Sequence, residues 1–210
     1  MKALEIVFWI SVFVVFYTYI GYGIVLWVLV KVKETFRPRK EPRMPDELPE
    51  VTLFVAAYNE ERVVDEKMAN TRSLDYPADR LKVVWVTDGS DDSTNRRLEA
   101  YPEVEVFFQP ERQGKTAALN RGIEFVETSL VVFTDANTML NREAIREIVR
   151  CFSDPTVGCV AGEKRIAVRR LDGAAAGGEG LYWKYESALK RLDWRLYSAM
   201  GAAGELFAVR

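Results

Sequence analysis

Residues 51–60 read VTLFVAAYNE, an apolar run that ends in a polar turn. The run 51–57 has the length of a strand and no polar alternation, which is typical of a strand buried on both faces of a sheet. Asn59 suits the N-cap of a following helix, which we predict over residues 60–74. The stretch therefore predicts a strand, a turn and a helix in succession.

The same alternation continues along the chain. Three more apolar runs predict strands, and the segments that follow them predict helices. The predicted strands are residues 82–87, 104–109 and 130–134, and the predicted helices are residues 91–100, 115–127 and 141–152. Strands that alternate with helices in this way favour an α/β fold, a mostly parallel sheet with flanking helices on both faces.

Three of the four predicted strands end in acidic or amide side chains. AYNE (57–60) follows the first strand, TDGSDDS (87–93) the second and TDANT (134–138) the fourth. Ligands of parallel sheets bind outside the carboxyl ends of the strands, where these segments meet. Converging carboxylates repel one another unless a cation or hydrogen-bond donors offset their charge, and hard divalent cations take oxygen ligands. We therefore expect a ligand site at this edge, with a divalent cation.

Two further features bear on the ligand at this edge, the first on the cation and the second on an anion. Asp135 and Asn137 alternate along an extended turn, which places their oxygens on one side. Lys115 lies near the start of a predicted helix, where an ammonium and free backbone N–H groups can meet an anion. The alternative for Lys115 is a solvated residue at a helix start.

Two common nucleotide-binding motifs are excluded. Gly114-Lys115-Thr116 resembles the end of a P-loop, but the position that would need the first glycine is Gln109. A dinucleotide-binding G-x-G-x-x-G is missing after the first predicted strand. Neither a P-loop NTPase nor a nicotinamide-binding fold is therefore predicted.

Residues 6–30 carry no charged side chain. At about 1.5 Å per residue they form a helix of roughly 37 Å, enough to cross a hydrocarbon core of about 30 Å. A cleaved signal peptide fits poorly, because the run exceeds a signal core and no A-x-A-like site follows. A soluble core helix is rarely apolar all round over such a length. We predict a transmembrane helix within residues 1–30.

Basic residues cluster directly after the apolar run, whereas Lys2 alone precedes it. The cluster is Lys31, Lys33, Arg37, Arg39, Lys40 and Arg43. The positive-inside rule then predicts a single-pass protein of the cell (plasma) membrane, with its N-terminus outside and residues 31–210 in the cytoplasm. Residues 31–49, which are also rich in proline, predict a juxtamembrane linker near anionic headgroups of the lipid bilayer.

Composition excludes several classes of function. The 29 Lys and Arg against 31 Asp and Glu give a net charge of −2, which argues against nucleic acid as a partner. The chain has no His, which removes Ser-His-Asp and Cys-His catalysis and His metal ligands. Cys151 and Cys159 fit neither a zinc pattern nor a disulfide framework and predict ordinary packed residues.

The motifs AYNE, DGSDDST, GKTAALN and TDANT, in this order, resemble those of the family 2 glycosyltransferases of the GT-A fold. The membrane-bound branch with cellulose, hyaluronan and poly-N-acetylglucosamine synthases is the most similar. The resemblance covers roughly residues 50–210, which would form a partial, nucleotide-sugar-binding domain. It implies a metal-dependent, inverting transfer of a sugar from a UDP-sugar donor to a glycan or lipid-linked acceptor, with Mg²⁺ or Mn²⁺ as cofactor.

The resemblance also implies roles for individual residues. The nucleotide would be bound by Tyr58, Glu60, Asp88, Lys115 and Asp135. Asp88 would accept a hydrogen bond from uracil; as a residue before Gly89 it could also serve only the turn. Asp135 would bind the metal and the diphosphate, with Asn137 at the second D-x-D position. An amide oxygen can ligate a hard cation but adds no charge, so we expect weaker metal binding.

The catalytic base is left unassigned. In the family, a T-E-D motif that carries the base and then Q-x-x-R-W follow a segment like GAAGELFAVR (201–210), and neither occurs in residues 1–210. Glu163, Glu179 and Glu205 are carboxylates without a positional argument. Two hypotheses stay open: a glycosyltransferase completed by a further segment or another chain, or a sugar-nucleotide-binding membrane subunit without turnover.

The remaining segment combines a small-residue run with aromatic side chains. LDGAAAGGEG (171–180) predicts a flexible loop. Residues 178–197 carry aromatics at a spacing that suits an amphipathic helix, either on the membrane or beneath the acceptor, or simply packed in a core.

Overall fold

A computed structural model describes residues 2–39, 41–163, 174–199, 201–202 and 204–210. The chain divides into two compact units. One comprises Met1–Glu41 with Lys164–Gly201, and the other comprises Pro42–Glu163 with Ala202–Arg210.

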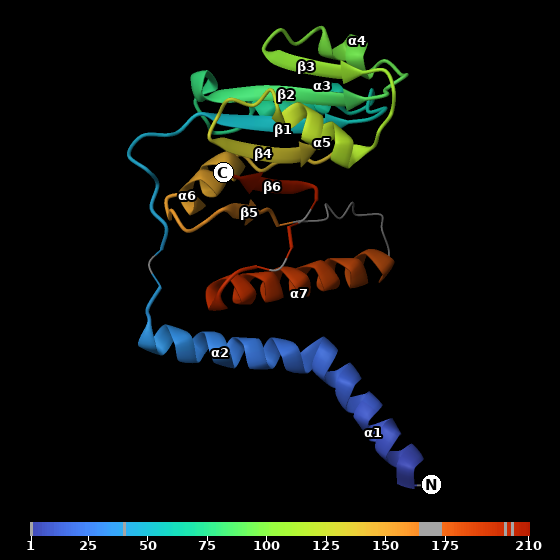
Figure 1. The fold of residues 1–210 in the computed structure, drawn as a ribbon, viewed down its shortest axis with the longest axis vertical. Coiled ribbons are helices and arrows are strands. Elements are labelled where there is room, and N and C mark those ends of the chain that lie inside the picture. The colour runs from blue at the N-terminus through green and yellow to red at the C-terminus, as the bar shows by residue number, and fades with distance from the viewer. Residues whose placement is uncertain (1, 40, 164–173, 200, 203) are drawn as a thin grey trace. The chain divides into compact units, whose positions relative to one another are not determined.

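The second unit is built on a six-stranded sheet of order β3-β2-β1-β4-β6-β5 (Figure 1). The strands are β1 (Val51–Ala57), β2 (Leu81–Asp88), β3 (Val104–Gln109), β4 (Leu130–Asp135), β5 (Cys159–Ala161) and β6 (Leu206–Val209). β3, β2, β1 and β4 are parallel neighbours, whereas β6 pairs antiparallel with both β4 and β5. The predicted mostly parallel sheet is confirmed.

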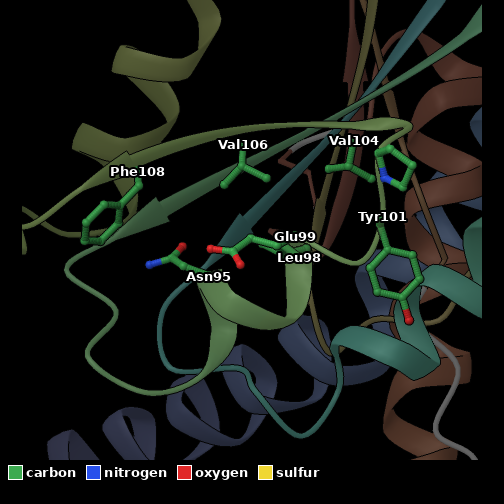
Figure 2. Close-up of a pocket in the computed structure, with 8 residues that line it drawn as sticks. Asn95, Leu98, Glu99, Tyr101, Val104, Val106 and Phe108 are labelled. Atoms are coloured by element: carbon green, nitrogen blue, oxygen red, sulfur yellow. The ribbon is translucent and has the colours of Figure 1, made fainter.

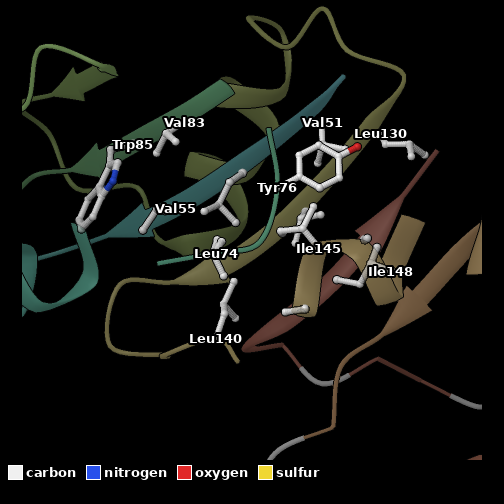
Figure 3. Close-up of a cluster of buried hydrophobic side chains, with 14 of the residues drawn as sticks. Val51, Val55, Leu74, Tyr76, Val83, Trp85, Leu130, Leu140, Ile145 and Ile148 are labelled. Atoms are coloured by element: carbon white, nitrogen blue, oxygen red, sulfur yellow. The ribbon is translucent and has the colours of Figure 1, made fainter. Parts of the chain in front are cut away.

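Helices cover both faces of this sheet. They are α3 (Val64–Arg72), the 3-10 turn η2 (Ala78–Arg80), α4 (Thr94–Leu98), α5 (Lys115–Ile123) and α6 (Ala144–Cys151). On one face, Val55, Trp85 and Val132 belong to a core with α3 and α6 (Figure 3). On the other, Phe54 and Phe133 pack with α5. Burial on both faces explains why β1, β2 and β4 are rich in consecutive apolar residues.

The predicted strands agree with the structure, but all four helices are shorter than predicted and three of them begin later, whereas α5 begins at Lys115 as predicted. The helix predicted from residue 60 begins at Val64, with Val63 at its N-cap. Asn59 is therefore not the cap: it lies in the preceding turn with φ 52°. Its side chain and the backbone N–H groups that follow bond to another loop instead of capping α3.

In the first unit, α1 (Lys2–Phe16), the π-helical turn η1 (Tyr17–Gly21) and α2 (Tyr22–Phe36) follow one another without a break. Together they form a helix of 35 residues, with a mean hydropathy of 2.0 in its most apolar window. This helix is long and apolar enough to span a membrane. Its apolar side chains are largely exposed on α1, as lipid contact requires.

The helix α7 (Ala174–Leu196) packs alongside α2. Arg195 donates to both Glu34 oxygens at 2.8 and 2.5 Å, and Tyr22 donates to Asp193 at 2.6 Å. The helix predicted over 178–197 is confirmed. The predicted loop is wrong for residues 174–180, where alanines favour the helix, while residues 171–173 lie outside the described residues.

Candidate functional site

Strand register brings the three polar turns together at one edge of the sheet. β1 lies between β2 and β4, so that Ala57 is level with Thr87 and Ala56 with Asp135. The segments that follow these strands therefore leave the sheet side by side. The predicted convergence of AYNE, DGSDDS and TDANT is what the parallel pairing produces.

Part of the first two motifs serves to join the loops to each other. Asn59 Nδ2 donates to Asp91 Oδ1 at 2.6 Å, and the Asp91 N–H donates back to Asn59 Oδ1 at 3.0 Å. Glu61 accepts from the Ser93 N–H at 3.1 Å, while its own N–H donates to Asp92 at 3.1 Å. These side chains cross-link two loops about thirty residues apart, and they hold the edge in shape.

Asp88 fastens a third loop to the same edge. Its side chain is buried, with 4% of the residue exposed. Oδ2 accepts from the N–H groups of Gln113 and Gly114 at 2.9 and 2.7 Å, and Arg121 lies 3.3 Å from Oδ1. Since a carboxylate offers about four acceptor positions, Oδ1 retains capacity for a further donor.

The loop held by Asp88 places a cation over an aromatic ring. The Arg112 guanidinium lies 3.8 Å from the Tyr58 ring centroid. Gly89 allows this approach: its φ is 71°, and a Cβ there would meet the Arg112 backbone N at 2.7 Å. Tyr58 remains 38% exposed, so its ring and the guanidinium present flat surfaces on which a planar base can stack.

Lys115 and Asp135 meet beside this loop. The Lys115 ammonium lies 2.5 Å from Asp135 Oδ1 and 3.1 Å from the Gly204 carbonyl. The Asp135 N–H donates to the Glu205 carbonyl at 3.3 Å. The segment that enters β6 thus borders the site, a contact that the sequence reasoning missed. The resemblance of residues 201–210 to an acceptor region was the signal that could have indicated it.

Negative charge concentrates at this point. The pKa of Glu60 is raised, first by burial and then by the charges of Asp135 and Asp92. A raised pKa means that the ionised carboxylate is disfavoured by its surroundings. A cation at this edge relieves that repulsion.

The residues present fit a divalent cation that is ligated by protein oxygens and phosphate oxygens together. Asp135 offers a partly exposed carboxylate and Asn137 an exposed amide. Among the described residues, no group of three Asp, Glu, Cys or His side chains could hold a metal alone. Mg²⁺ is usually bound by one or two carboxylates together with substrate phosphates, and this donor set matches that pattern.

A separate hollow of about 400 Å³ lies between α4 and the edge strand β3 (Figure 2). Its lining residues are Asn95, Leu98, Glu99, Tyr101, Pro102, Val104, Val106 and Phe108. None of the predicted site residues lines it. The open edge formed by Tyr58, Asp88 and Asp135, and not this hollow, is the candidate site.

The sequence profile described as "Glycosyl transferase family 2" matches residues 52–197. This chain belongs to glycosyl transferase family 2. The glycosyltransferase family predicted from the four motifs is thereby confirmed.

Characterised relatives of this glycosyltransferase-family chain include a polysaccharide synthase and a glycolipid synthase. This chain is 31% identical over 125 residues to a poly-beta-1,6-N-acetyl-D-glucosamine synthase of Staphylococcus aureus. The match covers 58% of this chain and 30% of the relative. It is 35% identical over 125 residues to the beta-monoglucosyldiacylglycerol synthase of Synechocystis, with coverage of 57% and 26%. The matched segment therefore spans about a third or less of either relative.

Among solved structures, the mannosyltransferase PcManGT from Pyrobaculum calidifontis, in complex with GDP-Man and Mn²⁺, superposes with a TM-score of 0.71. It is 27% identical, and the match covers 92% of this chain and 53% of PcManGT. S. aureus TarS in complex with UDP-GlcNAc has a TM-score of 0.52 at 21% identity, covers 60% of this chain and 37% of that one, and shares the fold.

Proposed function

We propose that residues 42–163 and 202–210 bind a UDP-sugar together with Mg²⁺ or Mn²⁺, as the donor site of a membrane-anchored, inverting glycosyltransferase. The single observation that carries this proposal is the meeting of Lys115 and Asp135 beside the Tyr58–Arg112 stack. One end of that edge suits a planar base and the other suits a metal-bound diphosphate.

The base would lie against Tyr58 and Arg112. Stacking of a base on an aromatic face contributes about 1–3 kcal/mol and tolerates every base, so it does not itself select uracil. In this proposal the selective contact is the free acceptor capacity of Asp88 Oδ1, which would take the N–H of the ring. PcManGT, whose fold is similar, is in complex with GDP-Man, so guanine is the competing base that the test includes.

The diphosphate would lie between Lys115 and the Asp135 turn. Asp135 and Asn137 would hold the divalent cation, which when bound stabilises the negative charge that develops on the departing diphosphate. Lys115 would contribute a second positive charge to the same oxygens. Glu60, whose pKa is raised, would border the site without ligating the metal.

In an inverting transfer, an acceptor hydroxyl oxygen attacks the anomeric carbon from the side opposite the nucleotide. The new glycosidic bond forms as the bond to the β-phosphate oxygen breaks, the electron pair leaves with UDP, and a base takes the hydroxyl proton. No described residue is assigned as this base. Glu205 lies in the segment that borders Asp135.

The acceptor is proposed to be a glycan or a lipid-linked molecule. The relatives make both kinds of product by name, a poly-N-acetylglucosamine and a glucosyldiacylglycerol. The apolar helix Lys2–Phe36 and the basic residues after it support an anchor in the plasma membrane with the N-terminus outside and the sheet in the cytoplasm.

The second candidate is a sugar-nucleotide-binding membrane subunit without turnover. The same donor site, in which no residue is assigned as the base, favours this candidate. Transfer assays separate the two: release of UDP from a panel of UDP-sugars by the purified chain supports the enzyme, and binding without release supports the subunit.

Calorimetry on the detergent-solubilised chain tests the donor site itself. We expect UDP to bind in the presence of Mn²⁺ more tightly than GDP or ADP, and Asp135→Ala to abolish the Mn²⁺-dependent part of the affinity. If UDP binds no better than ADP and Asp135→Ala changes nothing, the proposed donor site is wrong.

A further inference from the structure

A buried lysine lies beneath the Asp135 turn, outside the proposed donor site. Lys67 in α3 has no exposed surface. Its ammonium donates to Thr134 Oγ1 at 3.1 Å and to the carbonyl of Thr138. These two acceptors stand on either side of Asp135 and Asn137, so one side chain ties both ends of the turn to α3.

A second side chain of the same helix holds the far end of this stretch. Asn70, three residues after Lys67 and therefore on the same face of α3, donates through Nδ2 to the Leu140 carbonyl at 2.8 Å. The Leu140 N–H donates back to Asn70 Oδ1 at 2.8 Å. The pair of bonds fixes both the position and the orientation of the backbone at Leu140.

The stretch 134–140 presents alternate residues to opposite sides. Thr134, Ala136 and Leu140 are buried toward the protein, whereas Asp135 and Asn137 are partly or fully exposed. Contacts from α3 thus take up the inner side. The Asn137 amide and the Asp135 carboxylate lie on the outer side, where Asp135 Oδ1 accepts from Lys115. Their spacing is set by a backbone that α3 holds.

The charge of Lys67 is consistent with this arrangement. Among the described residues it forms no ion pair within 4.0 Å, and an ammonium in such a place is costly unless other interactions compensate it. Burial lowers the pKa of Lys67 to about 8, and the Asp135 charge partly offsets that effect. Lys67 therefore interacts electrostatically with the Asp135 carboxylate without forming an ion pair with it.

We propose that Lys67 and Asn70 are positioning residues for the metal-binding turn, an inference that rests on the proposed donor site. They touch neither the donor nor the cation. They hold Asp135 and Asn137 in the geometry that a divalent cation demands, since such cations require ligands at closely defined positions.

The test measures Mn²⁺-dependent UDP binding by calorimetry on the full chain in detergent. We expect Lys67→Met to weaken UDP binding in the presence of Mn²⁺ at least tenfold, and Asn70→Ala at least threefold. UDP affinity measured without Mn²⁺ should change less than twofold in both. Lys67→Arg, which keeps the charge and the donors, should recover part of the loss.

Met68→Ala is the matched control. Met68 is also fully buried in α3 but packs in the hydrophobic core, so its truncation lowers the thermal midpoint without altering the hydrogen bonds to the turn. We expect Met68→Ala to leave the Mn²⁺-dependent affinity within twofold of wild type.

The proposal is overturned if folded Lys67→Met binds Mn²⁺ and UDP like wild type. It is equally overturned if Met68→Ala, at a similar loss of thermal midpoint, weakens binding as much. Should Lys67→Met fail to fold, Asn70→Ala decides by the same criteria. A wild-type chain that shows no Mn²⁺-dependent nucleotide binding refutes the donor site itself, whereas equal binding by wild type and variants refutes only the positioning role.

Discussion

The Lys115 ammonium lies 2.5 Å from Asp135 Oδ1 and 3.1 Å from the Gly204 carbonyl. One side chain thus joins the start of α5, the end of β4 and the segment that enters β6. The two side chains of the pair are 48% and 26% exposed, so the pair contributes little to stability. Its consequence is local: it places a cation next to the carboxylate proposed to meet the diphosphate.

Replacing Lys115 should therefore separate binding from stability. We expect Lys115→Met to weaken UDP binding in the presence of Mn²⁺ about tenfold, or about 1.4 kcal/mol, because a charge-assisted hydrogen bond to the diphosphate is lost. The thermal midpoint of the detergent-solubilised chain should stay within about 2 °C of wild type. Calorimetry and thermal unfolding measure the two effects.

Lys82→Met is the matched control for this variant. Lys82 pairs with Glu50 and Glu127 near the starting end of β2, opposite the site. The substitution removes the same charge from the same domain, so it should leave UDP affinity unchanged. Equal losses in the two variants would mean that net charge, and not the position of Lys115, governs binding.

Gly89 should be required for the Arg112–Tyr58 stack. A Cβ at this position would meet the Arg112 backbone at 2.7 Å, and φ is 71°. We expect Gly89→Ala to lower the free energy of unfolding by about 1–3 kcal/mol and to weaken UDP binding, because the Arg112 loop must move. Gly158→Ala, where a Cβ meets no atom within 4 Å, should change both by little. Equal effects would contradict the close-approach argument.

Asn59 contributes to the turn through its backbone and its side chain, and two variants distinguish the contributions. Its φ is 52°, a region that Gly enters freely and Ala does not. Asn59→Gly removes only the reciprocal bonds to Asp91, whereas Asn59→Ala also imposes strain. We expect the free energy of unfolding of Asn59→Ala, measured by denaturant titration, to be about 1 kcal/mol lower than that of Asn59→Gly. Identical values would show that the turn relaxes to accommodate Ala.

Local sequence predicted the parts of this fold whose partners are local. The strand Val51–Ala57 agrees with the predicted residue range, since an apolar run between polar turns marks both ends of a buried strand. The edge strand Val104–Gln109 also agrees with its predicted range, although its residues are half-buried or exposed. The predicted start of α3 was wrong because the N–H groups of Glu60 and Glu61 donate to the side chains of Thr94 and Asp92. Partners more than thirty residues away leave no trace in a helix-capping pattern.

The rest of the site depends on long-range placement. β6 has only four residues, and nothing in its sequence indicates that it pairs antiparallel with β4 and carries Gly204 to Lys115. Lys67 is a charged residue in a helix, a type usually exposed, so its burial under the Asp135 turn could not be read from the sequence. The motifs indicated which side chains gather at the ends of the strands, and the fold showed which residues hold those segments in place.

The buried Lys67 should make stability depend on pH. Its pKa is lowered from 10.5 to about 8, chiefly by burial. Between those two values the unfolded chain binds a proton that the folded chain has lost, so the free energy of unfolding rises with pH across this window, by up to about 3 kcal/mol. Lys67→Met lacks this contribution. The free energy of unfolding of wild type minus that of the variant should therefore increase from pH 8 to pH 10.5. Denaturant titrations of both proteins at pH 7, 8, 9 and 10 measure that difference, and subtraction of the two curves removes other titrating groups. Parallel curves would show that Lys67 keeps an ordinary pKa and is solvated in the folded chain.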